Sequence, residues 1–245
     1  MWKKEMEVGR HAAREAGKIL TSLFGRVKEI KKKGEIDLVT EADIRAEKKI
    51  LEVLTEHFPQ DSILTEESGE HRHRPDRVWL IDPLDGTTNF AHALPFFAVS
   101  IALEVEKELV LGIIYNPHMD ELFGAVKGEG AFRNGSPIRV SKTEKIGDAL
   151  LITGFPYDVR ENPDGITLRF KKMLTLAQGV RRLGSAALDL AYVAAGIFDG
   201  YWEERLHPWD MAAGAVLVRE AGGQVSDYKG NPFSPYGKTI IASNG

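Results

Sequence analysis

The chain has 245 residues, of which 43% are hydrophobic and 28% charged, and its formal net charge is −4. Such a chain can bury a core as one large domain or as two smaller ones, and its charge does not indicate a general affinity for nucleic acid. The absence of cysteine excludes disulfides, thiolate zinc sites and cysteine nucleophiles. The amino terminus is amphipathic and no stretch approaches the roughly 18 apolar residues of a membrane span, so we expect a cytoplasmic protein without membrane partners.

Two amphipathic helices are predicted near the start of the chain. Apolar residues recur at helical spacing over residues 4–23. A second helix is indicated by the capping-box spacing of Thr40 and Asp43, which precedes another periodic apolar pattern. It should end near His57, because Pro59 disfavours helical backbone in the residue before it.

Strand signals dominate the following region of the chain. Asn134-Gly135 is a strong signal for a hairpin turn ahead of an apolar segment at 138–140. This much consecutive strand implies a largely antiparallel sheet behind the two helices. The apolar, β-rich runs cover residues 78–81, 98–103, 109–115, 122–126 and 131–132.

After about residue 145 the pattern changes to alternating strands and helices. We therefore expect two units, residues 1–145 with the helices and the mainly antiparallel sheet, and residues 146–245 as a second α/β half. The predicted strands cover residues 150–152, 180–183, 197–202 and 240–242, and the predicted helices residues 166–177, 186–195 and 209–221.

The sharpest chemical signal lies in residues 79–90. An apolar strand ends on Asp82, and the proline and glycine that follow can shape a turn that returns Asp85 to the same side. Two carboxylates so placed can bind hard divalent cations, which prefer oxygen ligands. The residues at 86–88 would begin a helix, where free backbone amides can receive a phosphate. A solvated turn that caps a helix explains this segment equally well when it is taken alone.

Other acids stand at the ends of predicted elements. Glu66 and Glu67 follow an apolar stretch, Asp210 lies in the first turn of a predicted helix, and Asp43 belongs to the capping box. Each of them alone is more often a cap or a surface charge. Together with Asp82 they predict an oxygen-lined site for more than one Mg²⁺.

Four blocks, in chain order residues 37–43, 66–68, 82–90 and 208–214, carry these acids. They resemble the signature blocks of the inositol monophosphatase family, a group of Mg²⁺-dependent, lithium-sensitive-type phosphatases, and the similarity extends from about Lys32 to Asn244. The resemblance implies an α+β fold, a layered α/β/α/β/α sandwich, and a homodimer. Family members usually continue past Gly245 into a further helix, and its absence from this sequence removes no motif residue.

The resemblance also implies a reaction, the hydrolysis of myo-inositol 1-phosphate to inositol and phosphate by a metal-activated water. Metal ions can lower the pKa of such a water and stabilise the leaving alkoxide. Residues 1–145 would carry most of the metal ligands, and residues 146–245 would complete the site. The implied ligands of up to three Mg²⁺ per subunit are Glu66, Asp82, Asp85, Asp210 and the Leu84 carbonyl, and the implied catalytic residues are Asp43, Glu66 and Thr87. The implied substrate-binding residues of this block are Asp85, Gly86, Thr87 and Thr88, of which the amides of Gly86 and Thr87 would donate to the phosphate.

Two later segments are expected to bind the alcohol portion of the substrate. Gly184, Ser185 and Ala186 match family positions that border the inositol ring, although a Gly-Ser helix cap explains them as well. Glu203 matches an acid that accepts hydrogen bonds from ring hydroxyls. The expected substrate is therefore a small phosphorylated polyol or sugar.

Two arginines leave the substrate choice open. Arg205 and Arg181 match positions at which broad-specificity microbial members carry bases, so they could bind the second phosphate of fructose 1,6-bisphosphate. Arg205 could equally form a salt bridge to Glu203, to Glu204 or to a dimer neighbour. A fructose-1,6-bisphosphatase or broad sugar phosphatase is thus the alternative enzyme, and a non-catalytic role in transcription complexes is an alternative of another class.

A mobile lysine is a further family feature. In the family, a loop brings one lysine toward the metals. In this chain the candidates are Lys31, Lys32 and Lys33.

Overall fold

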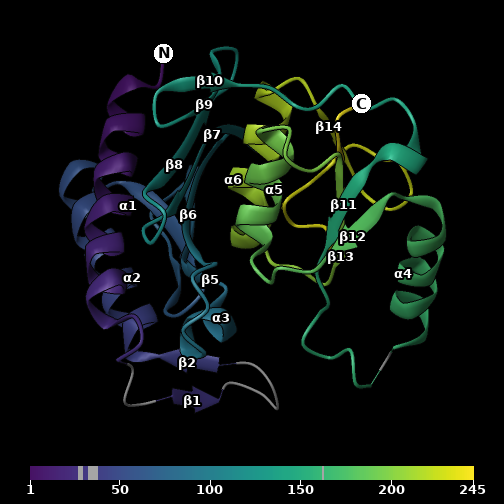
Figure 1. Cartoon of the computed structure of the whole chain (residues 1–245). Helices are drawn as coiled ribbons and strands as arrows, with labels where there is room; N and C mark the ends of the chain where they lie inside the picture. The colour runs from purple at the N-terminus through teal and green to yellow at the C-terminus, as the bar shows by residue number, and fades with distance from the viewer. Residues whose placement is uncertain (27–29, 33–37, 162) are drawn as a thin grey trace.

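Helical and sheet layers alternate across the molecule (Figure 1). The computed structural model describes residues 1–26, 30–32, 38–161 and 163–245. From one side to the other, the layers are α1 (Lys3–Leu23) with α2 (Glu41–His57), an eight-stranded sheet, α5 (Ala186–Ala194) with α6 (Pro208–Glu220), a five-stranded sheet, and α4 (Asp164–Leu176). The predicted α/β/α/β/α sandwich is confirmed.

The amino-terminal helices begin and end close to where the sequence indicates. Thr40 caps α2, because its Oγ1 accepts a hydrogen bond from the Ala42 amide at 3.1 Å and its own amide donates to Asp43 Oδ2 at 2.8 Å. The helix ends at His57, two residues before Pro59. Asp43 is thereby fixed in the first turn of α2.

The eight-stranded sheet is mainly antiparallel, as predicted. Its order is β10-β9-β8-β7-β6-β5-β3-β4, and β3 runs parallel to β5. Asn134 and Gly135, with φ angles of 49° and 80°, form the two-residue turn between β9 and β10. The strands are β3 (Asp61–Thr65), β4 (Gly69–His71), β5 (Arg74–Asp85), β6 (Ala98–Val105), β7 (Glu108–Asn116), β8 (Glu121–Val126), β9 (Gly130–Arg133) and β10 (Ser136–Ile138).

The five-stranded sheet mixes parallel and antiparallel pairs in the order β12-β11-β13-β15-β14. Its strands are β11 (Leu150–Thr153), β12 (Gly179–Arg181), β13 (Gly200–Glu204), β14 (Gln224–Ser226) and β15 (Thr239–Ser243). The chain passes from one sheet to the other between β10 and β11, but the division of the chain at residue 145 stays a prediction.

Sequence patterns missed or misplaced several short elements. β13 begins three residues after the predicted Ile197, because the Ile197 amide still bonds to the Tyr192 carbonyl in the turn that closes α5. The strands β1 (Ile30–Lys32), β2 (Leu38–Thr40), β3, β4 and β14 were not predicted; apart from β3, each has three residues, which are too few to display a period of two. The helix α3 (Thr87–Ala91) has one turn, and η1 (Ile146–Asp148) is a 3-10 turn.

The central helices are buried on all sides between the two sheets. Every residue of α5 is buried, and alanine and glycine let α6 approach the eight-stranded sheet closely. At the closest point, a Cβ on Gly112 of β7 would overlap with the Ala213 carbonyl of α6 and lie 2.9 Å from its Cα. Among the helices within the described ranges, none is both long and apolar enough to cross a membrane.

We predict that Gly112→Ala lowers the free energy of unfolding by about 1–3 kcal/mol, because the added methyl group overpacks the contact between β7 and α6. Urea unfolding measures the change. Gly147→Ala is the matched control, since the nearest atom to a Cβ at this exposed position is 3.9 Å away. Equal stability of the two variants would contradict the close packing of α6.

Candidate active site

A cavity of about 520 Å³ opens where the ends of both sheets meet the starts of α3, α5 and α6. It is lined from segments that are far apart in the sequence. The predicted residues that line it are Glu66, Asp82, Leu84, Asp85, Gly86, Thr87, Thr88, Gly184, Ser185, Ala186, Glu203, Arg205 and Asp210. Asp43 and Arg181 do not line it.

A β-bulge brings Asp82 and Asp85 to the same cavity. Asp82 pairs with Ser100 of β6 and Asp85 with Ala98, so β5 carries one extra residue over this interval. Side chains alternate between the faces of a strand, and residues three apart would normally point in opposite directions. The extra residue lets both side chains point to the same side. The sequence suggested a turn after a strand that ends on Asp82, whereas the structure places the irregularity within β5.

The start of α5 holds Asp85 in place. Ser185 Oγ and the Ala187 amide both donate hydrogen bonds to Asp85 Oδ2, the latter at 2.8 Å. Ser185 is also the N-cap of α5, and it is buried. Its hydroxyl therefore orients a candidate metal ligand, a contact that spans 100 residues of sequence and has no local signal.

Asp210 and Glu66 are fixed by their neighbours. The His207 amide donates to Asp210 Oδ2 at 2.7 Å at the start of α6. Glu66 follows β3, where Glu47 Oε2 accepts hydrogen bonds from Thr65 Oγ1 at 2.6 Å and from the Glu67 amide at 2.9 Å. Glu47 of α2 thus positions the residues on both sides of Glu66. It was not predicted, because nothing local distinguishes it from the other acids of α2.

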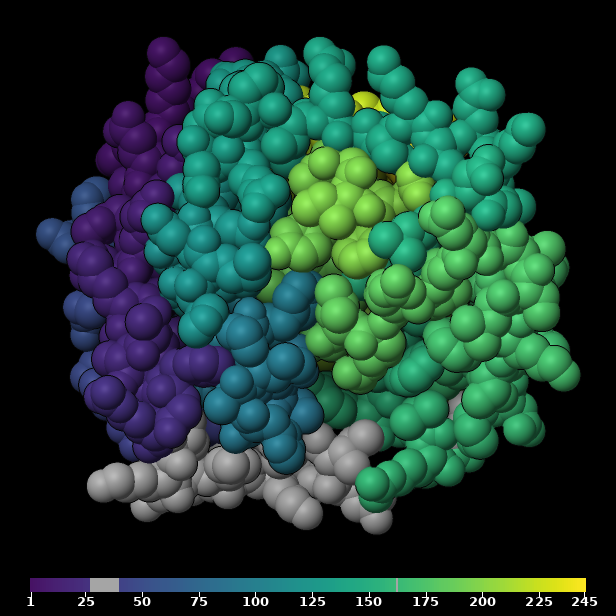
Figure 2. Space-filling model, in the orientation of Figure 1, coloured from purple at the N-terminus to yellow at the C-terminus, as the bar shows by residue number. Residues whose placement is uncertain are grey.

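The side chain of Asn89 also joins the two sides of the cavity. Asn89 of α3 donates from Nδ2 to the Phe96 carbonyl at 2.7 Å and to the Leu183 carbonyl at 2.8 Å. In the space-filling view, the blue atoms near residue 90 lie against the green atoms near residue 183 (Figure 2). Gly86, with φ of 93°, begins α3 in a left-handed conformation, and a Cβ there would lie 3.2 Å from the Gly184 carbonyl.

Burial and mutual repulsion raise the pKa values of these carboxyl groups. Burial raises the pKa of Asp82 well above its usual range, and the charges of Glu66, Asp85 and Asp210 raise it further. The pKa of Asp210 is likewise raised, by burial and then by Asp85. Burial raises the pKa of Asp85 to about 6, although its hydrogen bond from Ser185 acts in the opposite direction. Such a cluster favours protons or cations between its members.

The donor set suits Mg²⁺. The groups are carboxylates and the Leu84 carbonyl, all oxygen donors of the kind that hard divalent cations prefer. Hydrogen bonds from the chain reach Oδ1 of Asp82 and Oδ2 of Asp210, and a carboxylate has about four lone-pair positions, so acceptor capacity remains for a cation. Within the described ranges, no three acidic or histidine side chains are placed so that they could hold one metal ion together.

Asp43 reaches the cavity through Thr87. Thr87 Oγ1 lies 3.1 Å from Asp43 Oδ1 and 3.0 Å from the Leu84 carbonyl oxygen, and it can donate its proton to either. Burial raises the pKa of Asp43 to about 6, against the opposing effect of its hydrogen bonds from Thr40. The predicted catalytic pair is therefore in contact, with Thr87 at the cavity and Asp43 behind it.

Glu203 faces the cavity from the end of β13. Tyr201 Oη donates a hydrogen bond to Glu203 Oε2 at 2.6 Å, and burial raises the pKa of Glu203 to about 7. A Cβ on Gly154 would overlap with the Glu203 carboxylate, so only glycine permits this position of the acid. The carboxylate lies at the side of the cavity formed by the five-stranded sheet.

The structure corrects the placement of one arginine. Arg181 is exposed and donates to the Val180 carbonyl at 3.2 Å, away from the cavity. The next residue, Arg182, lines the cavity instead, with its guanidinium 5.8 Å from the Phe155 ring centre. Successive residues of an extended segment point to opposite sides, so a shift of one position exchanges them. Arg205 lines the cavity and forms an ion pair with Asp158.

The lysine candidates cannot be assigned to the cavity. Lys31 and Lys32 belong to the backbone of β1, and Lys33 lies outside the described residues.

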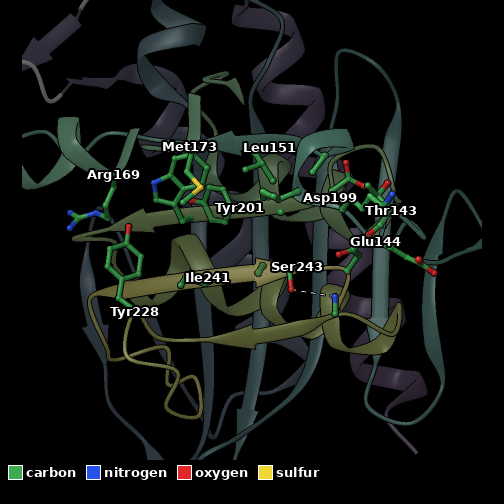
Figure 3. Close-up of a pocket in the computed structure, with 18 residues that line it drawn as sticks. Thr143, Glu144, Leu151, Arg169, Met173, Asp199, Tyr201, Tyr228, Ile241 and Ser243 are labelled. Carbon is green, nitrogen blue, oxygen red and sulfur yellow. Dashed lines mark hydrogen bonds between the residues drawn. The ribbon is translucent and has the colours of Figure 1, made fainter. Parts of the chain in front are cut away.

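A second cavity, of about 600 Å³, lies on the outer face of the five-stranded sheet between α4 and β15 (Figure 3). Arg169 and Tyr228 lie at one end, and Thr143, Glu144 and Asp199 at the other. None of the predicted site residues lines it. The candidate chemistry therefore belongs to the first cavity.

Comparison with known proteins decides the family. The model of the "Inositol monophosphatase family" matches residues 2–245. The chain belongs to the inositol monophosphatase family. Among its relatives in this family, an inositol-1-monophosphatase of Synechocystis sp. is 48% identical over 242 residues, which cover 98% of this chain and 84% of the relative.

Two further members are also close. The Nus factor SuhB of Salmonella typhimurium is 43% identical over 98% of this chain and 91% of its own length. The structure of inositol monophosphatase from Anabaena (Nostoc) sp. is similar with a TM-score of 0.91 and 45% identity, covering 99% of this chain and 91% of that chain. The relatives thus include proteins named as inositol monophosphatases and proteins named as Nus factors.

We predict that the metal-free protein loses stability as the pH rises from about 4 to about 7. The pKa values of Asp43 and Asp85 rise from 3.8 to about 6 on folding, and that of Glu203 rises from 4.5 to about 7. In this window the folded protein holds protons that the unfolded chain has lost, so its stability falls with pH. Thermal unfolding in chelator measures the effect.

Mg²⁺ should reverse this trend, since a cation replaces the protons between the carboxylates. The increase in Tm on adding Mg²⁺ is expected to be larger at pH 7.5 than at pH 5.5. Sodium chloride of equal ionic strength is the control. An equal increase at both pH values would contradict the assignment of Asp82, Asp85 and Asp210 as metal ligands.

Proposed function

We propose that this member of the family is a Mg²⁺-dependent phosphatase that hydrolyses inositol monophosphate to inositol and phosphate. The observation that carries the proposal is that Asp82, Asp85, Asp210 and Glu66 all line one cavity, with Thr87 beside them. Four acids from three separate segments surround this space, although burial, and then their mutual repulsion, raises the pKa values of several of them. Bound cations would offset the repulsion between these buried carboxylates, and a cation-dependent reaction would explain why they lie together.

Bound Mg²⁺ would supply the Lewis acidity that lowers the pKa of the attacking water and neutralises the phosphate oxygens. Thr87 and Asp43 orient that water. When Thr87 donates its proton to Asp43 Oδ1, its Oγ1 keeps two lone pairs and can accept a hydrogen bond from the water. Asp43 can then receive a proton through this contact.

The phosphate and the alcohol have separate contacts. The amides of Gly86 and Thr87, at the start of α3, are the proposed donors to phosphate. Glu203 is the proposed acceptor for ring hydroxyls, because its carboxylate lies at the cavity and is held by Tyr201. Ser185 acts on the reaction indirectly, by orienting Asp85. We further propose a homodimer, on the ground of the family resemblance.

A binding role in transcription complexes is a second candidate. It is favoured by one observation, the 43% identity to a protein named Nus factor SuhB. The two roles are compatible in one chain. Fructose 1,6-bisphosphate remains the alternative substrate, supported by Arg182 and Arg205 at the cavity.

Phosphate release from inositol 1-phosphate, with and without Mg²⁺, tests the proposed reaction. Fructose 1,6-bisphosphate and phosphoadenosine phosphate serve as competing substrates in the same assay. Release from inositol 1-phosphate that requires Mg²⁺ is the expected result. A folded protein that releases phosphate from none of the three compounds would leave the binding role as the better explanation.

We predict that Asp82→Asn and Asp210→Asn each lower kcat/KM by at least about 100-fold, because each removes one charge from the proposed metal site. Circular dichroism should show an intact fold. Asp164→Asn is the control for the loss of one carboxylate, since Asp164 is exposed and does not line the cavity. Full activity of either site variant would refute the metal assignment.

We predict that Thr87→Ala and Asp43→Asn lower kcat by about 100-fold or more and change KM much less. Their proposed contact with the water acts mainly in the transition state. Steady-state kinetics at saturating Mg²⁺ separate the two parameters. A large rise in KM at constant kcat would show instead that these residues bind the substrate.

A further inference from the structure

We propose that Asp158 is a specificity-determining residue, which acts through Arg205 and biases the cavity toward substrates with a single phosphate. The inference rests on the proposed phosphatase function and names the class of substrate more narrowly. Asp158 belongs to the segment 154–161, which leads from β11 toward α4.

This segment forms one wall of the cavity. Phe155, Pro156, Tyr157 and Val159 line it, whereas Asp158 does not. Asp158 instead binds the guanidinium of Arg205 with its Oδ1. Its influence on a substrate therefore passes through Arg205, which does line the cavity.

The backbone of Arg205 is fixed in a position that suits this ion pair. Its φ angle of 62° is in the left-handed region, which residues with a side chain seldom adopt. Its amide donates to the Lys238 carbonyl at 2.5 Å. The backbone hydrogen bond therefore fixes the Cα of Arg205, and the ion pair with Asp158 positions its guanidinium.

Glu204 is already bound by another cation. Its Oε2 forms an ion pair with Arg169, whose guanidinium lies 5.0 Å from the Tyr228 ring centre, at the end of the second cavity (Figure 3). Glu204 Oε1 is 3.9 Å from Arg205 Nε, at the outer limit of an ion pair. Asp158 is therefore the principal partner of Arg205.

Binding of a second phosphate at Arg205 would be electrostatically unfavourable. The phosphate would have to displace Asp158 from Arg205, and Asp158, Glu204 and Glu161 all act electrostatically on this arginine. These acids offset part of the charge of Arg205, so its attraction for an incoming dianion is weakened. Unfavourable charge placed near the wrong ligand is a common basis of specificity. Arg182 lines the same cavity, but its charge acts on Glu203 and its guanidinium packs over Phe155.

The test compares two substrates in variants of the ion pair. The quantity measured is the ratio of kcat/KM for fructose 1,6-bisphosphate to kcat/KM for inositol 1-phosphate. Asp158→Asn should raise this ratio about fivefold or more, because Arg205 becomes available to the second phosphate. Asp158→Glu keeps the charge and should leave the ratio near the wild-type value.

Two further variants exclude trivial causes. The double variant Asp158→Asn with Arg205→Ala should lose the increase, since the effect requires the arginine. Asp164→Asn removes a nearby exposed carboxylate that does not pair with Arg205, and it should not change the ratio. An unchanged or lower ratio in Asp158→Asn overturns the inference. Equal losses on both substrates overturn it as well, because they show that Asp158 only anchors the segment.

The proposed function can fail separately. If the wild-type protein releases phosphate from neither compound, the phosphatase assignment is wrong. The increase in Tm caused by fructose 1,6-bisphosphate in the presence of Mg²⁺ then tests the same point without turnover. A larger increase in Asp158→Asn than in wild type supports the role of Asp158, and an equal increase refutes it.

Discussion

The cost of gathering carboxylates in a partly buried space constrains the rest of this structure. Asp82 is 2% exposed and Asp43 1%, and burial is the largest cause of the raised pKa values of both. The chain offsets some of this cost with hydrogen bonds from backbone amides and hydroxyls at the starts of helices. Capping groups thus have two tasks, since they begin α2, α5 and α6 and also orient acids at the cavity.

The layered fold explains how these caps meet. The acidic end of β5 lies in the eight-stranded sheet, while α5 and α6 stand between the two sheets, with their first turns at the same cavity (Figure 1). The close contact between Gly112 and Ala213 sets α6 against the sheet. Asn89 then ties the first turn after β5 to the segment before α5. Small residues and one amide side chain therefore decide how the acids face one another.

Sequence patterns predicted the features of this arrangement that depend on local chemistry. The cap at Thr40, the turn at Asn134-Gly135 and the acids of β5 are visible because neighbouring residues alone determine them. Features that depend on distant partners left no such trace. They include the bulge in β5, the hydrogen bonds of Glu47, the exchange of Arg181 for Arg182, and the ion pair of Asp158 with Arg205. The family resemblance supplied the candidate residues of the site but not these contacts.

The hydrogen bonds between Asp85 and α5 affect the order in which secondary structure and the cation-binding site form during folding. Asp85 lies on β5, and its donors, Ser185 and Ala187, follow it by 100 and 102 residues. Closing so long a loop costs conformational entropy before the contact is rewarded, and such non-local contacts slow folding. Before that closure, the chain can build both sheets and still lack a correctly aimed Asp85. Recovery of cation binding during refolding would therefore lag behind recovery of secondary structure, and would report the docking of α5.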